Sequence, residues 1–338
     1  MHCPRLSELP PPPAGKTGWP WTVASKRLAS GRDNGTVWPR ISVVTPSYNQ
    51  GQFIEETIRS VLLQGYPDLE YMVIDGGSTD GSVEIIKKYS RWLTYWCSEK
   101  DRGQAHAINK GLEQATGQIG AYLNSDDCYL PGALAHVGRT YRRFQFDVFV
   151  GQRWRGSYFK RGNRCHAVRP FVYPFIAGDK MRYEMPQECV FWNHQRSRRL
   201  RFDESFSFCM DVWWFARIFS GALAVHSSRR IGVFRFHDQS KSATIQELSD
   251  PESDRLWAEL REHLGAVPAD FREKTRQTYY RMTLGTVLLR LLCPWRDYYL
   301  LYRHPNYLPG EVSHHGGDGR ADYCAAMDHG NQPQHTGR

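Results

Sequence analysis

Residues 119–132 of the chain read IGAYLNSDDCYLPG, an apolar run that stops abruptly on polar and acidic residues. The run Ile119 to Leu123 has the length and the boundaries expected of a buried strand. Asp126 and Asp127 follow it, and two adjacent carboxylates at the end of a buried strand repel each other and lose hydration. A divalent cation offsets that cost, because hard oxygen ligands suit Mg²⁺ or Mn²⁺. A solvated turn that caps a helix before Pro131 is the simpler alternative for an isolated Ser-Asp-Asp.

Two strands joined by a helix precede this segment and predict a parallel sheet. Ile41 to Thr45 is rich in β-branched residues, and Tyr71 to Asp75 forms a second strand that ends at the glycine-rich loop 76–81. Strands that alternate with helices predict right-handed crossovers, and ligands of such sheets bind beyond the carboxyl ends of the strands. We therefore expect one crevice to be lined by the residues at these strand ends: Tyr48, Asp75, Asp126 and Asp127.

Asp75 and Tyr48 each have two interpretations. Asp75 is either a turn cap or a carboxylate that accepts from the N3–H of uracil or from a ribose hydroxyl. Tyr48 is either a packing residue or a surface on which a base stacks. Neither GxxxxGK[ST] nor GxGxxG occurs, which excludes a P-loop and a dinucleotide fingerprint.

The composition describes an ordinary globular protein with a basic surface. The chain has 338 residues, of which 41% are hydrophobic and 23% are charged, enough for one large domain with an appendage. A net charge of +9 favours anionic partners such as nucleotide phosphates, phospholipid head groups or nucleic acid. The basic run Arg196 to Arg201 lies inside the expected folded domain and lacks a recognised nucleic-acid module, so we expect no nucleic-acid partner.

Cysteine usage and hydropathy indicate the compartment. The 8 cysteines are scattered without a CxxC pair, which is typical of reduced thiols in the cytosol. The N-terminal residues lack the apolar core of a signal peptide, and the longest apolar run, Leu284 to Cys293, is interrupted by Arg290 and too short to span a bilayer. These features predict a cytoplasmic protein, with peripheral contact at the inner face of the membrane left open.

The sequence divides into four segments. Residues 1–38 are rich in proline and glycine and predict a weakly ordered leader, residues 39–245 an α/β domain, residues 246–308 a helical extension and residues 309–338 a disordered tail. Within the extension, helices are expected over 252–264 and 271–292. Aromatic residues and arginines then follow up to Arg303, which leaves packing against the domain and contact with a membrane surface as alternatives.

Three blocks of the α/β domain resemble a known family when taken together and in order. RISVVTPSYNQGQFIEETIRSVLLQGYPDLEYMVIDGGSTDGSVEII, SEKDRGQAHAINKGL and GAYLNSDDCYLPGAL are similar to the successive motifs of a family 2 glycosyltransferase. The resemblance implies the GT-A fold, in which a Rossmann-like, mostly parallel sheet flanked by helices joins a nucleotide half to an acceptor half. It also implies a nucleotide-diphospho-sugar donor and a glycan or lipid-linked acceptor, in cell-surface polysaccharide synthesis.

The resemblance assigns roles to individual residues. Asn124 to Asp127 is similar to the DxD element of the family, with Asn in place of the first acid. Asp126 is then the first choice as ligand of Mn²⁺ or Mg²⁺, Asp127 the second, and His237, at the end of a late strand, a third. The nucleotide site is expected to include Pro46, Tyr48, Asp75, Asp101, Lys110, Asn124, Ser125 and Asp126.

By the same resemblance, Asp211 occupies the family's acid position at the start of a helix and is the expected catalytic base of an inverting, metal-dependent transfer. Three simpler interpretations stand beside these assignments: Asp211 as a helix cap, Lys110 as a solvated lysine and His237 as a structural histidine. Two rival functions are a sugar-nucleotidyltransferase and a non-catalytic nucleotide- or polysaccharide-binding protein. The first would carry a Gly- and Arg-rich loop after the first strand, where this chain has Thr-Pro-Ser-Tyr-Asn.

Overall fold

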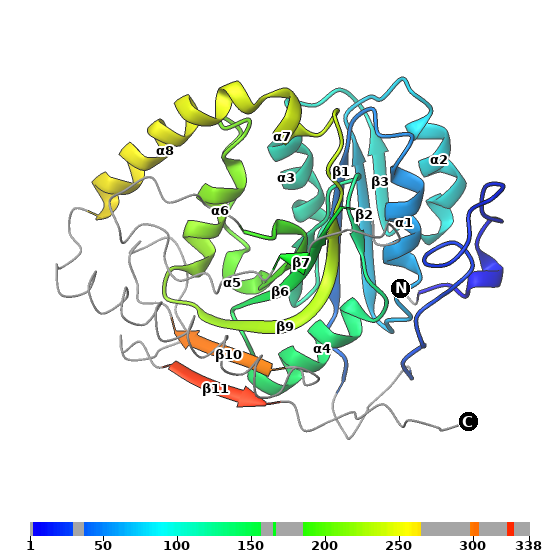
Figure 1. Cartoon of the computed structure of the whole chain (residues 1–338), viewed down its shortest axis with the longest axis horizontal. Helices are drawn as coiled ribbons and strands as arrows, with labels where there is room; N and C mark the ends of the chain where they lie inside the picture. The colour runs from blue at the N-terminus through cyan, green and yellow to red at the C-terminus, as the bar shows by residue number, and fades with distance from the viewer. Residues whose placement is uncertain are drawn as a thin grey trace.

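The computed structural model describes residues 3–29, 37–156, 165–166, 185–264, 298–303 and 323–327, and most of them belong to a mixed α/β domain (Figure 1). Eleven strands in this part of the chain form one curled sheet in the order β11-β10-β9-β6-β8-β4-β1-β2-β3, with β5 paired to β9 and β7 to β6. The strands are β1 (Ile41–Ser47), β2 (Leu69–Asp75), β3 (Tyr95–Ser98), β4 (Ile119–Tyr122), β5 (Cys128–Tyr129), β6 (Val148–Arg155), β7 (Cys165–His166), β8 (Val190–Asn193), β9 (Leu223–Phe234), β10 (Tyr298–Arg303) and β11 (Tyr323–Met327).

The predicted parallel order holds in the first half of the sheet. β1 lies between β2 and β4 and is parallel to both, so that Ile41 is paired with Leu69 on one side and with Ile119 on the other. β3 continues this parallel half beside β2. The second half is mixed rather than mostly parallel, because β8 runs antiparallel to β4 and β6 while β6 and β9 are parallel.

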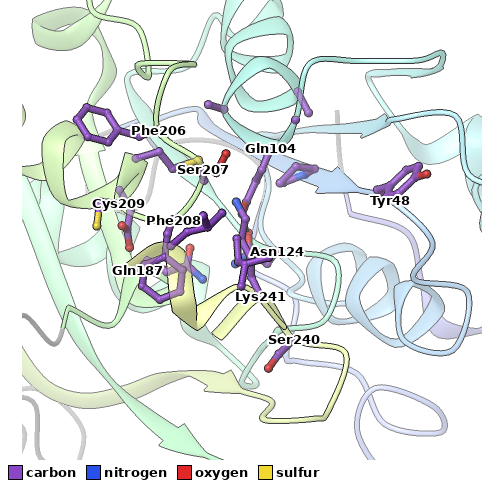
Figure 2. Close-up of a pocket in the computed structure, with 18 of the residues that line it drawn as sticks. Tyr48, Gln104, Asn124, Gln187, Phe206, Ser207, Phe208, Cys209, Ser240 and Lys241 are labelled. Carbon is purple, nitrogen blue, oxygen red and sulfur yellow. The ribbon is translucent and has the colours of Figure 1, made fainter. Parts of the chain in front are cut away.

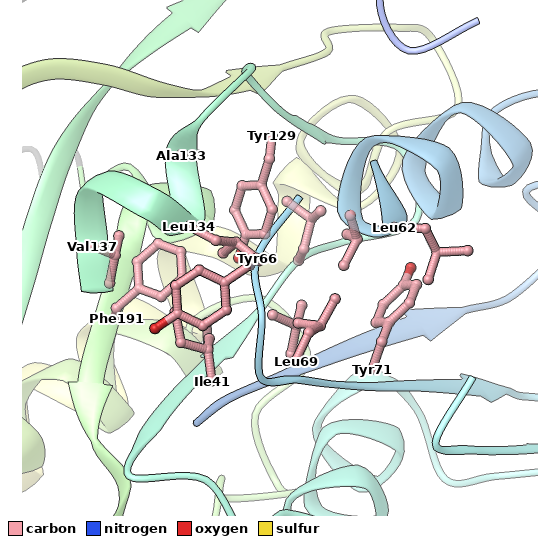
Figure 3. Packing of buried hydrophobic residues seen from close by; sticks show 14 of the residues in the cluster. Ile41, Leu62, Tyr66, Leu69, Tyr71, Tyr129, Ala133, Leu134, Val137 and Phe191 are labelled. Atoms are coloured by element: carbon pink, nitrogen blue, oxygen red, sulfur yellow. The ribbon is translucent and has the colours of Figure 1, made fainter. Parts of the chain in front are cut away.

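Helices cover both faces of the sheet because successive side chains of a strand point to opposite faces. Val43 of β1 joins one core cluster, with α1 and α4, and Val44 joins the other, with α3 and α6. Figure 3 shows the first cluster, where Leu62 of α1 and Leu134 of α4 pack over β1 and β2. The helices are α1 (Ile54–Leu62), α2 (Ser82–Tyr89), α3 (Gln104–Gln114), α4 (Ala133–Phe144), α5 (His194–Ser197), α6 (Met210–Phe219), α7 (Lys241–Thr244) and α8 (Ser249–Leu264).

The N-terminal segment packs on the domain, so the prediction of a weakly ordered leader is wrong for residues 3–29. Trp19 and Trp21 are buried, and the indole of Trp19 donates to the carbonyl oxygen of Tyr129 at 2.9 Å. Arg59 of α1 is fully buried and donates to three carbonyl oxygens of the segment at 2.9–3.1 Å, those of Pro10, Pro20 and Trp21. Composition indicated weak order, but a buried guanidinium and two tryptophans supply the contacts that hold the segment.

Replacing Arg59 with Met is expected to detach this segment. Three carbonyl oxygens, two of them in buried hydrogen bonds, would lose a charged donor, which should lower the free energy of unfolding by about 3 kcal/mol or more. Urea denaturation measures that change, and limited proteolysis should cut first within residues 3–29. Arg91→Met is the matched control, because the Arg91 guanidinium lies over the ring of Trp92 at an exposed position. Equal stability of the two variants would contradict the assigned role of Arg59.

The C-terminal region combines a helix with two strands. α8 confirms the helix expected over 252–264, while the helix expected over 271–292 lies outside the described residues. β10 and β11 extend the sheet beyond β9, so residues 298–303 and 323–327 are strand rather than helix or disordered tail. Tyr299 and Leu300 are buried there, because a β-forming run can pair with an open sheet edge. Among the described residues, no helix is long and apolar enough to cross a membrane.

Candidate active site

A cavity of about 1530 Å³ opens at the carboxyl ends of β1, β2 and β4. In Figure 2, Tyr48 lies at one end, Phe206 and Phe208 lie at the other, and Asn124 lies between them. Most of the residues predicted from the sequence line this one cavity: Pro46, Tyr48, Asp101, Asn124, Ser125, Asp126 and Asp211. Four of them, Asp75, Lys110, Asp127 and His237, are not among its lining residues.

The loop that follows β4 is held in place by α1. The amide of Asp127 donates to the carbonyl oxygen of Asn124 at 3.0 Å and closes the turn. The Thr57 hydroxyl lies 2.7 Å from the carbonyl oxygens of both Ser125 and Asp127, and it accepts from Arg235 Nη2 at 2.9 Å. The backbone carbonyl groups of Ser125 and Asp127 therefore point toward α1, where Thr57 holds the loop in position. Asn124 and Asp126 of the same loop line the cavity.

Asp126 and His237 form a pair at the edge of the cavity. Asp126 Oδ2 lies 3.0 Å from His237 Nε2, and the imidazole packs on the ring of Phe53 with centroids 4.3 Å apart. Carboxylate oxygen is a usual ligand of Mg²⁺ and Mn²⁺ and imidazole nitrogen one of divalent transition-metal ions, and adjacent ligands of an octahedral Mg²⁺ are about 2.9 Å apart. No group of three or more His, Cys, Asp or Glu residues suited to a metal occurs in the described part of the chain. Two protein ligands fit a cation that is completed by substrate phosphates and water.

Asp127 points away from this pair. Its Oδ2 accepts from Gln187 Nε2 at 3.0 Å and its Oδ1 from the amide of Arg235 at 3.0 Å. Burial, followed by the charges of Asp126 and Glu188, raises the pKa of Asp127 well above its usual range. Both oxygens are directed to protein donors, so the structure does not bring Asp127 to the predicted metal position. It gives Asp127 the role of an anchor between the loop, Gln187 and β9.

Asp75 is enclosed by its own turn. Its carboxylate accepts from the amides of Gly77 and Ser78 at 3.1 and 2.9 Å, and from the hydroxyls of Ser78 and Ser98 at 2.5 and 2.7 Å. The side chain is fully buried. This is the turn-cap interpretation of Asp75: the carboxylate fixes the loop at Gly76 and Gly77, and the loop itself lines the cavity.

Asp75→Ala is therefore expected to act on stability first and on nucleotide binding second. Loss of a charged acceptor of four hydrogen bonds should lower the free energy of unfolding by about 2–4 kcal/mol. Calorimetry should show weaker binding of uridine and guanosine diphosphates by a similar factor, because the loop and not a base contact has changed. Ser98→Ala, which removes one of the four donors, should show a smaller loss. Unchanged stability with a loss confined to one base would contradict the turn-cap role.

Asp101 and Lys110 have different positions relative to the cavity. Asp101 lines it, and its Oδ1 accepts from the amide of Gly103 at 2.8 Å. Lys110 lies on α3 and forms an ion pair with the exposed carboxylate of Glu99. The predicted phosphate contact of Lys110 is not brought to the cavity, whereas Lys100, which precedes Asp101, lines it.

Asp211 lies in the first turn of α6, two residues after Cys209, which Figure 2 shows at the end of the cavity away from Tyr48. Its Oδ1 accepts from the amide of Val212 at 2.8 Å. Burial raises the pKa of Asp211 to about 6, against the lowering effects of that hydrogen bond and of the Lys241 charge. The carboxylate is thus mostly ionised at neutral pH and yet more basic than an ordinary aspartate, which suits a general base.

Lys241 and Gln104 were missed by the sequence interpretation. Lys241 Nζ donates to Gln104 Oε1 at 2.8 Å, and Gln104 Nε2 donates to Asn124 Oδ1 at 2.6 Å. Figure 2 shows Gln104, Asn124 and Lys241 together in the middle of the cavity. Burial lowers the pKa of Lys241, and the charges of Asp211 and Glu252 oppose that effect. The only indication in the sequence that Lys241 lies near the site was its position four residues after His237.

The sequence of the domain decides its family. Residues 42–206 match the profile described as Glycosyl transferase family 2. This part of the chain belongs to glycosyltransferase family 2. TuaG of Bacillus subtilis (strain 168), whose name links it to teichuronic acid biosynthesis, is 43% identical over 98 residues, which are 27% of this chain and 38% of TuaG. The glycosyltransferase alr2836 of Nostoc sp. is 31% identical over 106 residues, 30% of this chain and 33% of that protein. The matched segments thus span about a third of the length of these relatives.

Solved structures of a glycosyltransferase confirm the predicted GT-A fold. S. aureus TarS 1-349 in complex with UDP-GlcNAc has a TM-score of 0.57 at 17% identity, over 75% of this chain and 76% of that one. The complex of the same protein with UDP has a TM-score of 0.55 at 18% identity, over 71% and 70% of the two chains. At this identity the similarity to TarS concerns the fold alone.

Proposed function

We propose that this chain transfers a sugar from a nucleotide-diphospho-sugar to a hydroxyl of a glycan or lipid-linked acceptor, with inversion at the anomeric carbon. The observation that carries the proposal is a single cavity with two different acidic sites. Asp126, paired with His237, belongs to the loop of Asn124 in the middle of the cavity, and Asp211, whose pKa is raised to about 6, lines the same cavity from the first turn of α6. The TarS structures with UDP and UDP-GlcNAc and the name of TuaG support a nucleotide-sugar donor and a role in cell-surface polysaccharide synthesis.

The donor occupies the end of the cavity near Tyr48 in this proposal. The Tyr48 side chain is 63% exposed and presents an open aromatic face on which a base can stack. Pro46, the Gly76–Gly77 loop and Asp101 surround the adjacent space for the ribose and diphosphate. Lys100 lines the same end and places a positive charge there.

Asp126 and His237 are the residues that would hold Mn²⁺ or Mg²⁺ against the diphosphate. Such a cation, when bound, stabilises the negative charge that develops on the leaving nucleoside diphosphate. Lys241 is positioned beside Asn124 through Gln104 and contributes a second, fixed positive charge to the middle of the cavity. Arg235 donates to the backbone oxygen of Asp126 and so fixes the main chain at the metal position.

Asp211 accepts the proton of the acceptor hydroxyl in this mechanism. The hydroxyl oxygen forms a bond to C1 of the donor sugar as the bond from C1 to the diphosphate oxygen breaks. The electron pair of the broken bond leaves with the nucleoside diphosphate, and the proton passes to the carboxylate of Asp211. Attack from the face opposite the leaving group inverts the configuration at C1.

The reaction class is tested by identifying the nucleotide products. The purified protein is incubated with a panel of nucleotide-diphospho-sugars and Mn²⁺, with and without added pyrophosphate, and the products are separated by anion-exchange chromatography and identified by mass spectrometry. Release of a nucleoside diphosphate from a donor supports the proposal, whether the sugar passes to a glycan or to water. Formation of a nucleoside triphosphate from donor and pyrophosphate would instead show a sugar-nucleotidyltransferase and overturn it.

A further inference from the structure

α8 is fixed to the segment that leads into the helix of Asp211. The carboxylate of Glu252 accepts from three successive amides, those of Ser207, Phe208 and Cys209, at 2.6–2.9 Å. α6 has no capping side chain of its own at Cys209, so Glu252 supplies the acceptor that its N-terminus needs. One turn further along α8, Arg255 Nη2 donates to the Ser205 hydroxyl at 2.8 Å. α8 therefore keeps a defined position relative to Asp211.

One face of α8 lines the cavity. Asp250, Ser253, Asp254 and Trp257 recur at spacings of three, four and seven residues, which places them on the same side of the helix, and all four are lining residues. The indole Nε1 of Trp257 donates to the Ser253 hydroxyl at 3.0 Å. This hydrogen bond orients the indole along the helix, so that its ring is a fixed part of the wall.

Aromatic rings of the preceding segment form the wall beside α8. Phe206 and Phe208 line the cavity on either side of Ser207, at the end that is far from Tyr48 in Figure 2. Phe206 is held under the guanidinium of Arg255, 4.4 Å from the ring centroid. The end of the cavity beyond Asp211 thus combines aromatic faces with hydroxyl and carboxylate oxygens.

The side chains at this end of the cavity favour a ligand that has both an apolar face and hydroxyl groups. A pyranose ring presents a face of C–H groups that packs on an aromatic ring, and its hydroxyls donate to carboxylates, which only accept when ionised. Asp250 and Asp254 are exposed carboxylates that disfavour a second negative charge beside them. The nucleotide end differs, because Lys100, whose backbone lies next to Gly77 of the loop there, places a positive charge at it.

We propose that the cavity-facing side of α8 is the acceptor subsite and that it binds an uncharged sugar ring stacked on Trp257. This inference rests on the proposed transfer and adds the chemical class of the acceptor. The ring next to the reacting hydroxyl carries neither a carboxylate nor a phosphate. Glu252 acts in this subsite as a positioning residue, since it ties α8 to the helix of Asp211.

Saturation-transfer NMR on the full chain tests the subsite, with a nucleoside diphosphate and Mg²⁺ present. The probes are the methyl glycosides of glucose, galactose and N-acetylglucosamine, together with those of glucuronic and galacturonic acid. At least one neutral glycoside should receive saturation, strongest on the ring hydrogens of one face. The uronic acid glycosides should bind about tenfold more weakly or not at all, because like charges then oppose each other.

Two sets of variants make the test specific. Trp257→Leu should abolish the saturation signal, while Trp92→Leu, which changes a partly buried tryptophan outside the cavity, should leave it unchanged. The double change Asp250→Asn and Asp254→Asn keeps size and exposure, and it should raise the affinity for the uronic acid glycosides to that for the neutral ones.

Three results would overturn the inference: no neutral glycoside binds, Trp257→Leu binds it as well as the wild type, or the uronic acid glycosides bind the wild type as strongly as the neutral ones. Calorimetry of nucleoside diphosphate binding by the wild-type protein, in the same samples, distinguishes failure of the acceptor assignment from failure of the proposed transfer. Binding of the diphosphate without any glycoside leaves the proposed transfer standing and removes only the acceptor assignment. Failure of both would remove the proposed function itself.

Discussion

We expect Asp211→Asn to lower turnover by roughly a hundredfold to ten-thousandfold, the usual effect of removing a positioned base. Asparagine keeps the volume of the side chain and can still accept from the Val212 amide through its oxygen, but it cannot take a proton. Binding of nucleoside diphosphate, measured by calorimetry, should therefore stay at the wild-type value.

Asp203→Asn is the matched control for this variant. Asp203 also accepts hydrogen bonds within its own turn, from the amide and the hydroxyl of Ser205, but it does not line the cavity. Its turnover should be close to that of the wild type. If Asp211→Asn lost donor affinity and turnover together, Asp211 would be organising the donor site, and if it lost neither, it would only cap α6.

The raised pKa of Asp211 also has consequences for pH dependence. The base must be ionised, so turnover should fall about tenfold per pH unit below pH 6. The free energy of unfolding changes with pH in the opposite sense. Ionising this half-buried carboxylate costs nothing below its unfolded pKa of 3.8, and the cost is complete above about pH 6. At pH 8, Asp211→Asn should thus raise the free energy of unfolding by about 1–3 kcal/mol, as measured in urea. A loss of stability at pH 8 would contradict a burial-raised pKa.

Removal of the divalent cation should abolish turnover. We expect EDTA to reduce the rate at least about a thousandfold and Mn²⁺ or Mg²⁺ to restore it, because stabilising the leaving diphosphate is worth several kcal/mol. Asp126→Asn should weaken the metal-dependent part of nucleoside diphosphate binding, and His237→Ala should do the same, since both groups lie at the proposed metal position.

Asp127→Asn is the informative comparison, because the substituted residue is adjacent to Asp126. Its oxygens accept from Gln187 and the Arg235 amide, so the change should affect stability and leave metal-dependent binding in place. Full activity in EDTA would refute the metal assignment. Equal losses of metal-dependent binding in the Asp126 and Asp127 variants would show that the loop, and not one carboxylate, carries the site.

The features predicted from sequence are those with local causes. The strands β1, β2 and β4 follow from apolar runs, and parallel order brings their carboxyl ends together, so Tyr48 and Asp126 could be placed in one crevice without coordinates. Asp211 could be found because its segment resembles the acid-bearing helix start of family 2 glycosyltransferases.

The features that were missed depend on contacts between distant segments. Glu252 reaches the amides before α6 across 43–45 residues, and Lys241 reaches Gln104 across 137, and neither contact leaves a local pattern. Which of two adjacent carboxylates faces the cavity is likewise decided by partners far away in sequence, here Gln187 and Arg235 for Asp127. For Arg59, the deciding partners are carbonyl groups of a proline-rich segment that composition alone describes as weakly ordered.

The proposed mechanism is a single displacement of the nucleoside diphosphate in this cavity, with Asp211 as base. The most direct test is the configuration of the first sugar product, followed by ¹H NMR from the start of the reaction with an α-linked nucleotide-diphospho-sugar and water as acceptor. A single displacement with inversion predicts that the β-anomer of the free sugar appears first and then equilibrates with the α-anomer. First appearance of the α-anomer would mean retention of configuration and would contradict it.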